Sequence, residues 1–193
     1  PIDGATAAKE LQAGRIMERI SGVMYALARM MAIAGGIVLA AITVLTVVSI
    51  TGRSLVPIGL APVPGDFELV EAGTAFAVFA FLPWCQLNRG HAAVDLFTSY
   101  LSAGANRWID LVAEILMTLT LIVLTWRLAY GMADKLRYGE TTFILQFPIW
   151  WGFAAAMIGA VVAVIISIYM TAMRAREVAT GRTLFAQRHG GGH

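Results

Sequence analysis

Charged residues are scarce in this chain of 193 residues. Asp, Glu, Lys and Arg together make up 13% of it, whereas 59% of the residues are hydrophobic and the mean hydropathy is +0.74. In an average globular protein roughly a quarter of the residues are charged, because the surface must be covered with polar groups. The composition therefore excludes an ordinary soluble domain and indicates an integral membrane protein.

Cysteine and histidine are also nearly missing. Cys85 is the only cysteine, so the sequence offers neither an internal disulfide nor a C-x-x-C redox pair. A membrane b-type haem usually needs two histidines within spans, and His91, His189 and His193 all lie outside the long apolar runs. A zinc site needs three or four ligands, and His91 and Asp95 supply only two at helical spacing. We therefore expect no metal, no cofactor and no catalytic residue in this chain.

Long uncharged runs are what the sequence does contain. Residues 30–51 and 141–173 carry no charge, and weaker apolar runs cover residues 72–88 and 108–130. About 20 apolar residues in a helix cross a hydrocarbon core of about 30 Å, and in lipid every backbone N–H and C=O must be satisfied internally. We expect an all-α membrane protein that forms a single domain over residues 1–193. Its four transmembrane helices should cover residues 29–52, 68–88, 107–131 and 146–173, and the tail 174–193 should be flexible.

Basic residues are distributed unequally between the two ends of these helices. Ten of the 14 Lys and Arg residues lie in the N-terminal segment, in the segment 89–107 and in the C-terminal tail, and four lie at the other end. The positive-inside rule therefore predicts that both termini are cytoplasmic. Most of the acids near the helix ends gather on the opposite face, which residues 53–67 and 131–146 form.

The segment before the first span carries an apolar stripe. Ile16, Ile20, Val23 and Leu27 recur at helical spacing, and basic residues flank them. The pattern predicts an N-terminal amphipathic helix that lies in the cytoplasmic membrane interface, with its basic residues near anionic lipid head groups. The alternative is that the stripe simply extends the first span downward.

A polar stretch separates the second and third predicted spans. In CQLNRGHAAVDLF, residues 85–97, the residues Arg89, Gly90, His91 and Asp95 follow one another closely. We interpret this stretch as a structural and topological motif. Glycine permits a turn, Arg89 lies at the cytoplasmic interface, and Asp95 caps or pairs near the start of a short amphipathic turn.

One acid lies inside the third predicted span. An intramembrane acid such as Glu114 is by default a hypothesis for function. Asp110 and Arg107 precede it at helical spacing, so Glu114 is also consistent with the upper rung of a polar ladder at the helix entry. Both interpretations, a structural acid and a proton or cation relay, stay open.

Small residues at four-residue spacing mark two spans. Gly36 and Ala40 form such a face in the first span, and Gly152 and Ala156 form one in the fourth. Faces of this kind allow helices to approach closely in lipid. One face can serve packing within the chain and the other a partner. We expect the fourth span to contact the partner because it is the longer and more uniformly apolar one.

The order of these features resembles one transporter family. A basic N-terminus is followed by SITGR at the end of the first span, DFELVEAG at the start of the second, NRGHAAVDLF after it, and GETTFILQFPIWWG before the fourth. Over about residues 25–173 this order resembles the small membrane subunit, of the DctQ/SiaQ type, of tripartite ATP-independent periplasmic (TRAP) transporters. The most specific pieces are the R-G-H-x-x-V-D stretch and the pattern of Gly139, Thr141, Pro148 and Trp150. The chain departs from the family at Phe67, where a Trp is frequent.

The resemblance implies a scaffold subunit of a sodium-coupled transporter for organic acids in the bacterial inner membrane. The implied partners are a large elevator-type membrane subunit, which would bind substrate and sodium, a periplasmic binding protein and membrane lipids, with no nucleic acid. The small subunit would widen the stationary scaffold and help to dock the binding protein, for which Arg53, Glu68, Glu71 and Glu140 are candidates. Two alternatives remain: a self-contained oligomeric carrier of ions or small molecules that uses Glu114, and an assembly subunit of another membrane complex.

Overall fold

The computed structural model describes residues 4–88 and 103–180 of the chain. Within these residues the fold is four long α-helices with a short 3₁₀ turn and no strand. All four are long and apolar enough to cross a membrane, which confirms the predicted all-α class and its four spans. The elements are α1 (Gly4–Ser54), η1 (Val56–Ile58), α2 (Asp66–Leu87), α4 (Ala103–Tyr138) and α5 (Trp150–Thr180).

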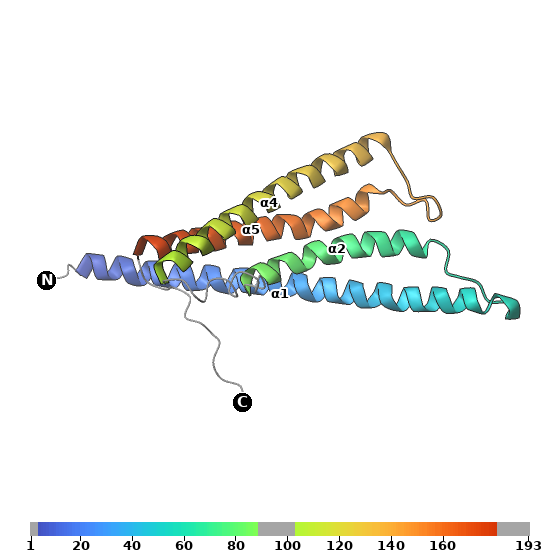
Figure 1. Cartoon of the computed structure of the whole chain (residues 1–193), viewed down its shortest axis with the longest axis horizontal. Coiled ribbons are helices and arrows are strands. Elements are labelled where there is room, and N and C mark those ends of the chain that lie inside the picture. The colour runs from blue at the N-terminus through green and yellow to red at the C-terminus, as the bar shows by residue number, and fades with distance from the viewer. Residues whose placement is uncertain (1–3, 89–102, 181–193) are drawn as a thin grey trace, which may run out of the picture.

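The first helix differs from the prediction. A separate interfacial helix before residue 29 is not confirmed, because α1 runs without interruption through 51 residues (Figure 1). The physical reason is visible in the sequence, since no proline occurs between Pro1 and Pro57 and nothing ends the helix earlier. The apolar stripe therefore continues the first span, which was the alternative interpretation.

The helices are arranged in the order α1, α2, α5, α4. α2 packs against α1 on one side and α5 on the other, and α4 packs against α5. The α1–α2 and α4–α5 connections lie at the same end of the molecule, which we call the loop end, and α4 and α5 diverge from α1 and α2 toward it (Figure 1). The opposite end holds the last turns of α2 and α5. Of the membrane-crossing segments, that of α5 is the most buried and that of α1 the least.

Small residues bring three of these helices together. Gly35 of α1 lies against Ala80 of α2, which is fully buried, and a Cβ on Gly35 would be 3.0 Å from the Cβ of Ala80. A Cβ on Gly159 of α5 would lie 2.7 Å from the carbonyl carbon of Phe79 and 2.8 Å from its oxygen. Backbone atoms cannot give way as side chains do, so α2 and α5 pack this closely only with glycine at residue 159.

The α4–α5 connection is shorter than expected because α4 continues to Tyr138. Gly139 turns the chain with a φ of 62°, and an isolated β-bridge pairs Thr141 with Pro148. The helix α5 begins at Trp150, four residues later than the predicted span, so Pro148 lies in the connection, two positions before the helix.

Candidate functional site

Five polar side chains bond across three helices near the opposite end. Gln86 of α2 donates from Nε2 to Glu114 Oε1 of α4, and also to Ser167 Oγ of α5 at 3.3 Å. The Oγ1 of Thr118 lies 2.6 Å from Ser167 Oγ and 2.8 Å from Thr171 Oγ1. Gln86 and Ser167 are buried, so these bonds form away from the surface of the chain. We call this group the polar network.

An ion pair lies next to the polar network. Arg174 of α5 binds Asp110 of α4, with Nη1 and Oδ2 3.0 Å apart, and both side chains are largely covered. Asp110 and Glu114 are the two acids for which the sequence suggested a polar ladder. Their partners come from α2 and α5, and this supports the structural interpretation of Glu114.

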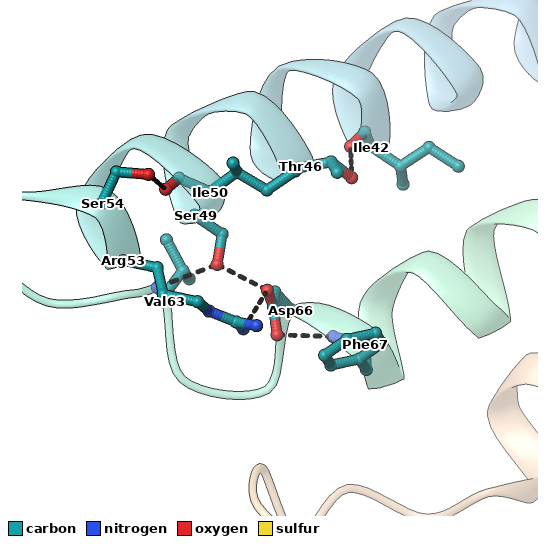
Figure 2. Close-up of polar contacts among 9 residues, drawn as sticks. All are labelled: Ile42, Thr46, Ser49, Ile50, Arg53, Ser54, Val63, Asp66 and Phe67. Carbon is teal, nitrogen blue, oxygen red and sulfur yellow. Dashed lines mark hydrogen bonds and ion pairs between the residues drawn. The ribbon is translucent and has the colours of Figure 1, made fainter.

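At the loop end, Asp66 fastens the α1–α2 connection to the last turns of α1 (Figure 2). Its Oδ2 accepts a bond of 2.5 Å from Ser49 Oγ, which is itself fully buried, and lies 3.9 Å from Arg53 Nη2. Oδ1 accepts the N–H of Phe67 at 2.9 Å, and the N–H of Val63 donates to Ser49 Oγ at 3.3 Å. A carboxylate at the first residue of α2 also interacts favourably with the helix dipole.

Glycine allows the same connection to lie close to α1. A Cβ on Gly52 would be 2.3 Å from the carbonyl oxygen of Ala61. Gly65, the residue before α2, has a φ of 75°, and a Cβ there would collide with the side chain of Leu145. The α1–α2 connection therefore approaches α1 at Gly52 and the α4–α5 connection at Gly65, and both positions disfavour a larger residue.

Glu68 joins the two connections. Its carboxylate accepts the backbone N–H groups of Ile144 at 2.6 Å and Leu145 at 2.9 Å, both in the α4–α5 connection. Arg53 pairs with Asp66, whereas Glu68 holds the α4–α5 connection.

The other two acids of the predicted docking face are also at the loop end. Glu140 binds Lys135, with Oε2 and Nζ 2.5 Å apart. Glu71 is exposed, lines a cavity between α2 and α5, and makes no hydrogen bond or ion pair with the described residues. Arg53, Glu68, Glu71 and Glu140 thus share one end of the molecule, as their places in the sequence predicted.

The two small-residue faces have different surroundings. Ala156 is 1% exposed, and a Cβ on Gly152 would lie 3.4 Å from the Cβ of Ala72 on α2. Ala40 is exposed, and nothing lies within 4 Å of a Cβ on Gly36. Since α5 lies between α2 and α4, its length and uniform apolarity reflect packing within the chain. Gly152 and Ala156 therefore pack within the chain, whereas Gly36 and Ala40 do not, and which span contacts a partner stays a prediction.

Four residues that the sequence singled out lie outside the described residues: Arg89, Gly90, His91 and Asp95. In the part of the chain that the structure describes, no group of three or more His, Cys, Asp or Glu side chains could hold a metal ion.

The sequence reasoning missed most of the polar network. Gln86, Thr118, Ser167, Thr171 and Arg174 received no role, although a signal was present. Thr118 continues the i, i+4 spacing of Asp110 and Glu114, while Ser167, Thr171 and Arg174 share one face of α5 at i, i+4 and i+7. A short connection makes α4 and α5 neighbours, so a polar stripe on each of them would have indicated the network.

Comparison with known proteins gave one match, to a protein family. The family model described as "Tripartite ATP-independent periplasmic transporters, DctQ component" matches residues 42–177. The match covers the last part of α1, all of α2 and α4, and nearly all of α5. No curated protein and no solved structure matched the chain.

Proposed function

Because this chain belongs to the DctQ family, the small membrane component of tripartite ATP-independent periplasmic transporters, we propose that it is the stationary scaffold subunit of a sodium-coupled transporter for organic acids. Its partners are a large membrane subunit, which moves the substrate, and a periplasmic binding protein, which delivers it. The four apolar helices and the family indicate a multi-pass protein of the inner membrane. The excess of basic residues at the opposite end supports cytoplasmic termini and a periplasmic loop end.

The scaffold assignment rests on the bonds that the polar side chains inside the helices make with one another. Polar groups in a transmembrane helix usually mark a substrate or ion path. Here Gln86, Glu114, Thr118 and Ser167 bond one another across three helices, and Asp110 binds Arg174. Groups committed to holding helices together are poor ligands for a transported solute, so substrate and sodium bind in the large subunit.

The loop end is the docking surface in this proposal. Asp66 and Glu68 fix both connections to the helix ends, so the surface needs little ordering when a partner binds. Arg53 and Glu71 remain exposed on it and offer charges of both signs to the periplasmic binding protein.

The first helix is the proposed contact with the large subunit. In the most apolar 18-residue stretch of α1, 6% of the residues are buried within the chain, compared with 39% in that of α5. Lipid provides no hydrophobic force between helices, so a face of small residues that permits close packing is the expected interface. Gly36 and Ala40 provide such a face and are not covered by the rest of the chain.

Reconstitution tests the assignment. Proteoliposomes should take up labelled mono- and dicarboxylates only when this chain, the large subunit, the binding protein and a sodium gradient are all present. Uptake by this chain alone would instead establish the self-contained carrier, for which Glu114→Gln is the diagnostic variant. Copurification of the chain with an unrelated membrane complex and not with a large transporter subunit would contradict the proposal.

The partner face is tested by bulky substitutions. Gly36→Leu with Ala40→Leu should reduce copurification with the large subunit while the chain still inserts in the membrane. Thr120→Leu, at an exposed position of α4, is the control and should copurify normally. Equal losses for both variants, or a loss only for the control, would contradict the assignment of the interface to α1.

A further inference from the structure

A cavity of about 560 Å³ lies at the loop end between α2, α4, α5 and the α4–α5 connection. Its volume falls within the roughly 300–1,000 Å³ that is usual for small-molecule sites. Small residues line it on two helices, with Ala72 and Ala75 on α2 and with Gly152 and Ala156 on α5. Leu128 of α4 lines it as well.

The cavity extends further along α2 than along α5. Its lining positions on α2 run from Glu68 to Phe79, which at 1.5 Å per residue corresponds to about 16 Å along the helix axis, and those on α5 run from Gly152 to Ala156, or about 6 Å. One leaflet of the hydrocarbon core is about 15 Å thick. The deeper wall is apolar and includes Phe79, Phe153 and Ala156. An extended acyl chain of a lipid fits an apolar slot that follows α2 for this length.

The charges are at the shallow end of the cavity. Glu68 and Glu71 lie one helical turn apart at the start of α2, and both line the cavity. The carboxylate of Glu68 is occupied by the N–H groups of Ile144 and Leu145. Glu71 has no partner among the described residues. The mouth therefore presents an uncompensated negative charge above an apolar slot, which favours a cationic group and disfavours an anionic one.

We infer that this cavity binds one phospholipid whose head group carries an ammonium, as in phosphatidylethanolamine. An acyl chain lies along α2 and α5 down to Phe79, and the ammonium group donates to the carboxylate of Glu71. The lipid fills the space between helices that the chain itself leaves unfilled. This inference goes beyond the proposed function and holds for either orientation of the chain in the membrane.

Native mass spectrometry of the complex with the large subunit tests the head group. The complex is first equilibrated in nanodiscs that contain equal amounts of phosphatidylethanolamine and phosphatidylglycerol. The wild type should retain a tightly bound phosphatidylethanolamine, and Glu71→Gln should lower the ratio of bound phosphatidylethanolamine to phosphatidylglycerol at least roughly tenfold. The control Asp134→Asn removes an exposed acid that does not line the cavity and should leave the ratio unchanged. An unchanged ratio in Glu71→Gln overturns the inference.

A substitution that fills the cavity tests whether a lipid acyl chain occupies it. Ala75→Leu places a larger side chain in the slot and should remove the tightly bound lipid, whereas Thr74→Leu, next to it on the exposed side of α2, should retain it. Equal retention in both variants contradicts the site. A photoreactive residue at position 75 provides the second measurement, and it should crosslink to lipid. Crosslinking to the large subunit instead would show that a protein segment fills the cavity, and this also overturns the inference.

Discussion

The two ends of the helix bundle are held together in different ways. Near the opposite end, side chains of α2, α4 and α5 bond one another directly through the polar network and the pair of Asp110 with Arg174. At the loop end, a cavity lies between α2, α4 and α5 beside the approach of Gly152 to Ala72. The polar link there runs from Glu68 of α2 to the backbone of the α4–α5 connection. Side chains between the helices hold the first end, and a side-chain bond to a loop backbone holds the loop end.

The difference follows from what lipid allows. Helices in lipid gain no hydrophobic energy from association, so close packing and directional bonds must hold them. Gly159 against Phe79 provides the first, and the polar network provides the second. Toward the loop end, Gly152 still approaches Ala72, but a cavity remains beside this contact, between α2, α4 and α5. Bonds between helix side chains therefore hold one end of the bundle, and bonds to the connections hold the other.

The largest effect should come from the close contact between α2 and α5. Gly159→Leu forces a side chain against the backbone of Phe79 and Ala80, so α5 must move away. We expect a loss of at least about 3 kcal/mol in the free energy of unfolding, together with little recoverable complex. Gly22→Leu is the control, because nothing lies within 4 Å of a Cβ there. Unfolding in mixed detergent micelles measures both, and similar stabilities would contradict the packing described.

The next effect concerns the polar network. Gln86→Leu leaves the carboxylate of Glu114 without its amide donor in α2 and should cost about 1–3 kcal/mol of unfolding free energy. Gln86→Leu with Glu114→Leu removes both partners and should recover part of this loss. Thr120→Ala removes a hydroxyl that bonds only within α4, to Leu116 O, and serves as the control. Additive losses in the double variant would show that Gln86 and Glu114 are not coupled.

A smaller effect should appear at the loop end. Glu68→Ala leaves the N–H groups of Ile144 and Leu145 without their acceptor, so the α4–α5 connection should open locally. Hydrogen exchange of residues 140–149 should become faster, while exchange in the middle of α5 stays as in the wild type. Asp134→Ala is the control for loss of an exposed acid. Faster exchange throughout α5 would contradict the separation of the two ends.

The smallest effect should follow from Ser49→Ala. Asp66 keeps its contacts with Arg53 and with the N–H of Phe67, so the α1–α2 connection loses one acceptor and one donor at a single hydroxyl (Figure 2). We expect a loss of about 0.5–1.5 kcal/mol in the free energy of unfolding. Thr51→Ala, whose hydroxyl bonds only to Val47 O in its own helix, should have less effect. The reverse order of the two variants would contradict the role of Ser49.

The sequence predicted the spans well because their signal is local. An uncharged run of sufficient length must be a helix in lipid, and each of the four predicted spans lies largely within one helix of the structure. The interfacial helix was a different case. An apolar stripe with basic flanks occurs both in a helix that lies on the membrane and in one that continues a span, and α1 is a single helix.

The contacts between helices were harder to predict because they depend on which faces meet. Gly152 and Ala156 have the same pattern as Gly36 and Ala40, but only the first pair packs within the chain. The network of Gln86 with Ser167 joins residues 81 positions apart, and no spacing rule within one helix reveals such a pair. By contrast, the sequence positions of the acids were enough to place them at the loop end, since these acids lie next to helix ends.

The central claim is that this chain stays rigid while the large subunit moves its substrate. Spin labels at Phe67 and Trp151, exposed positions at the loop-end starts of α2 and α5, report the separation of the two helices once Cys85 is replaced by serine. In the complete transporter, we predict the same distance distribution without ligands and with sodium, organic-acid substrate and binding protein. A distance that changes with these ligands would mean that this subunit moves with the transport cycle, and the scaffold assignment would be wrong.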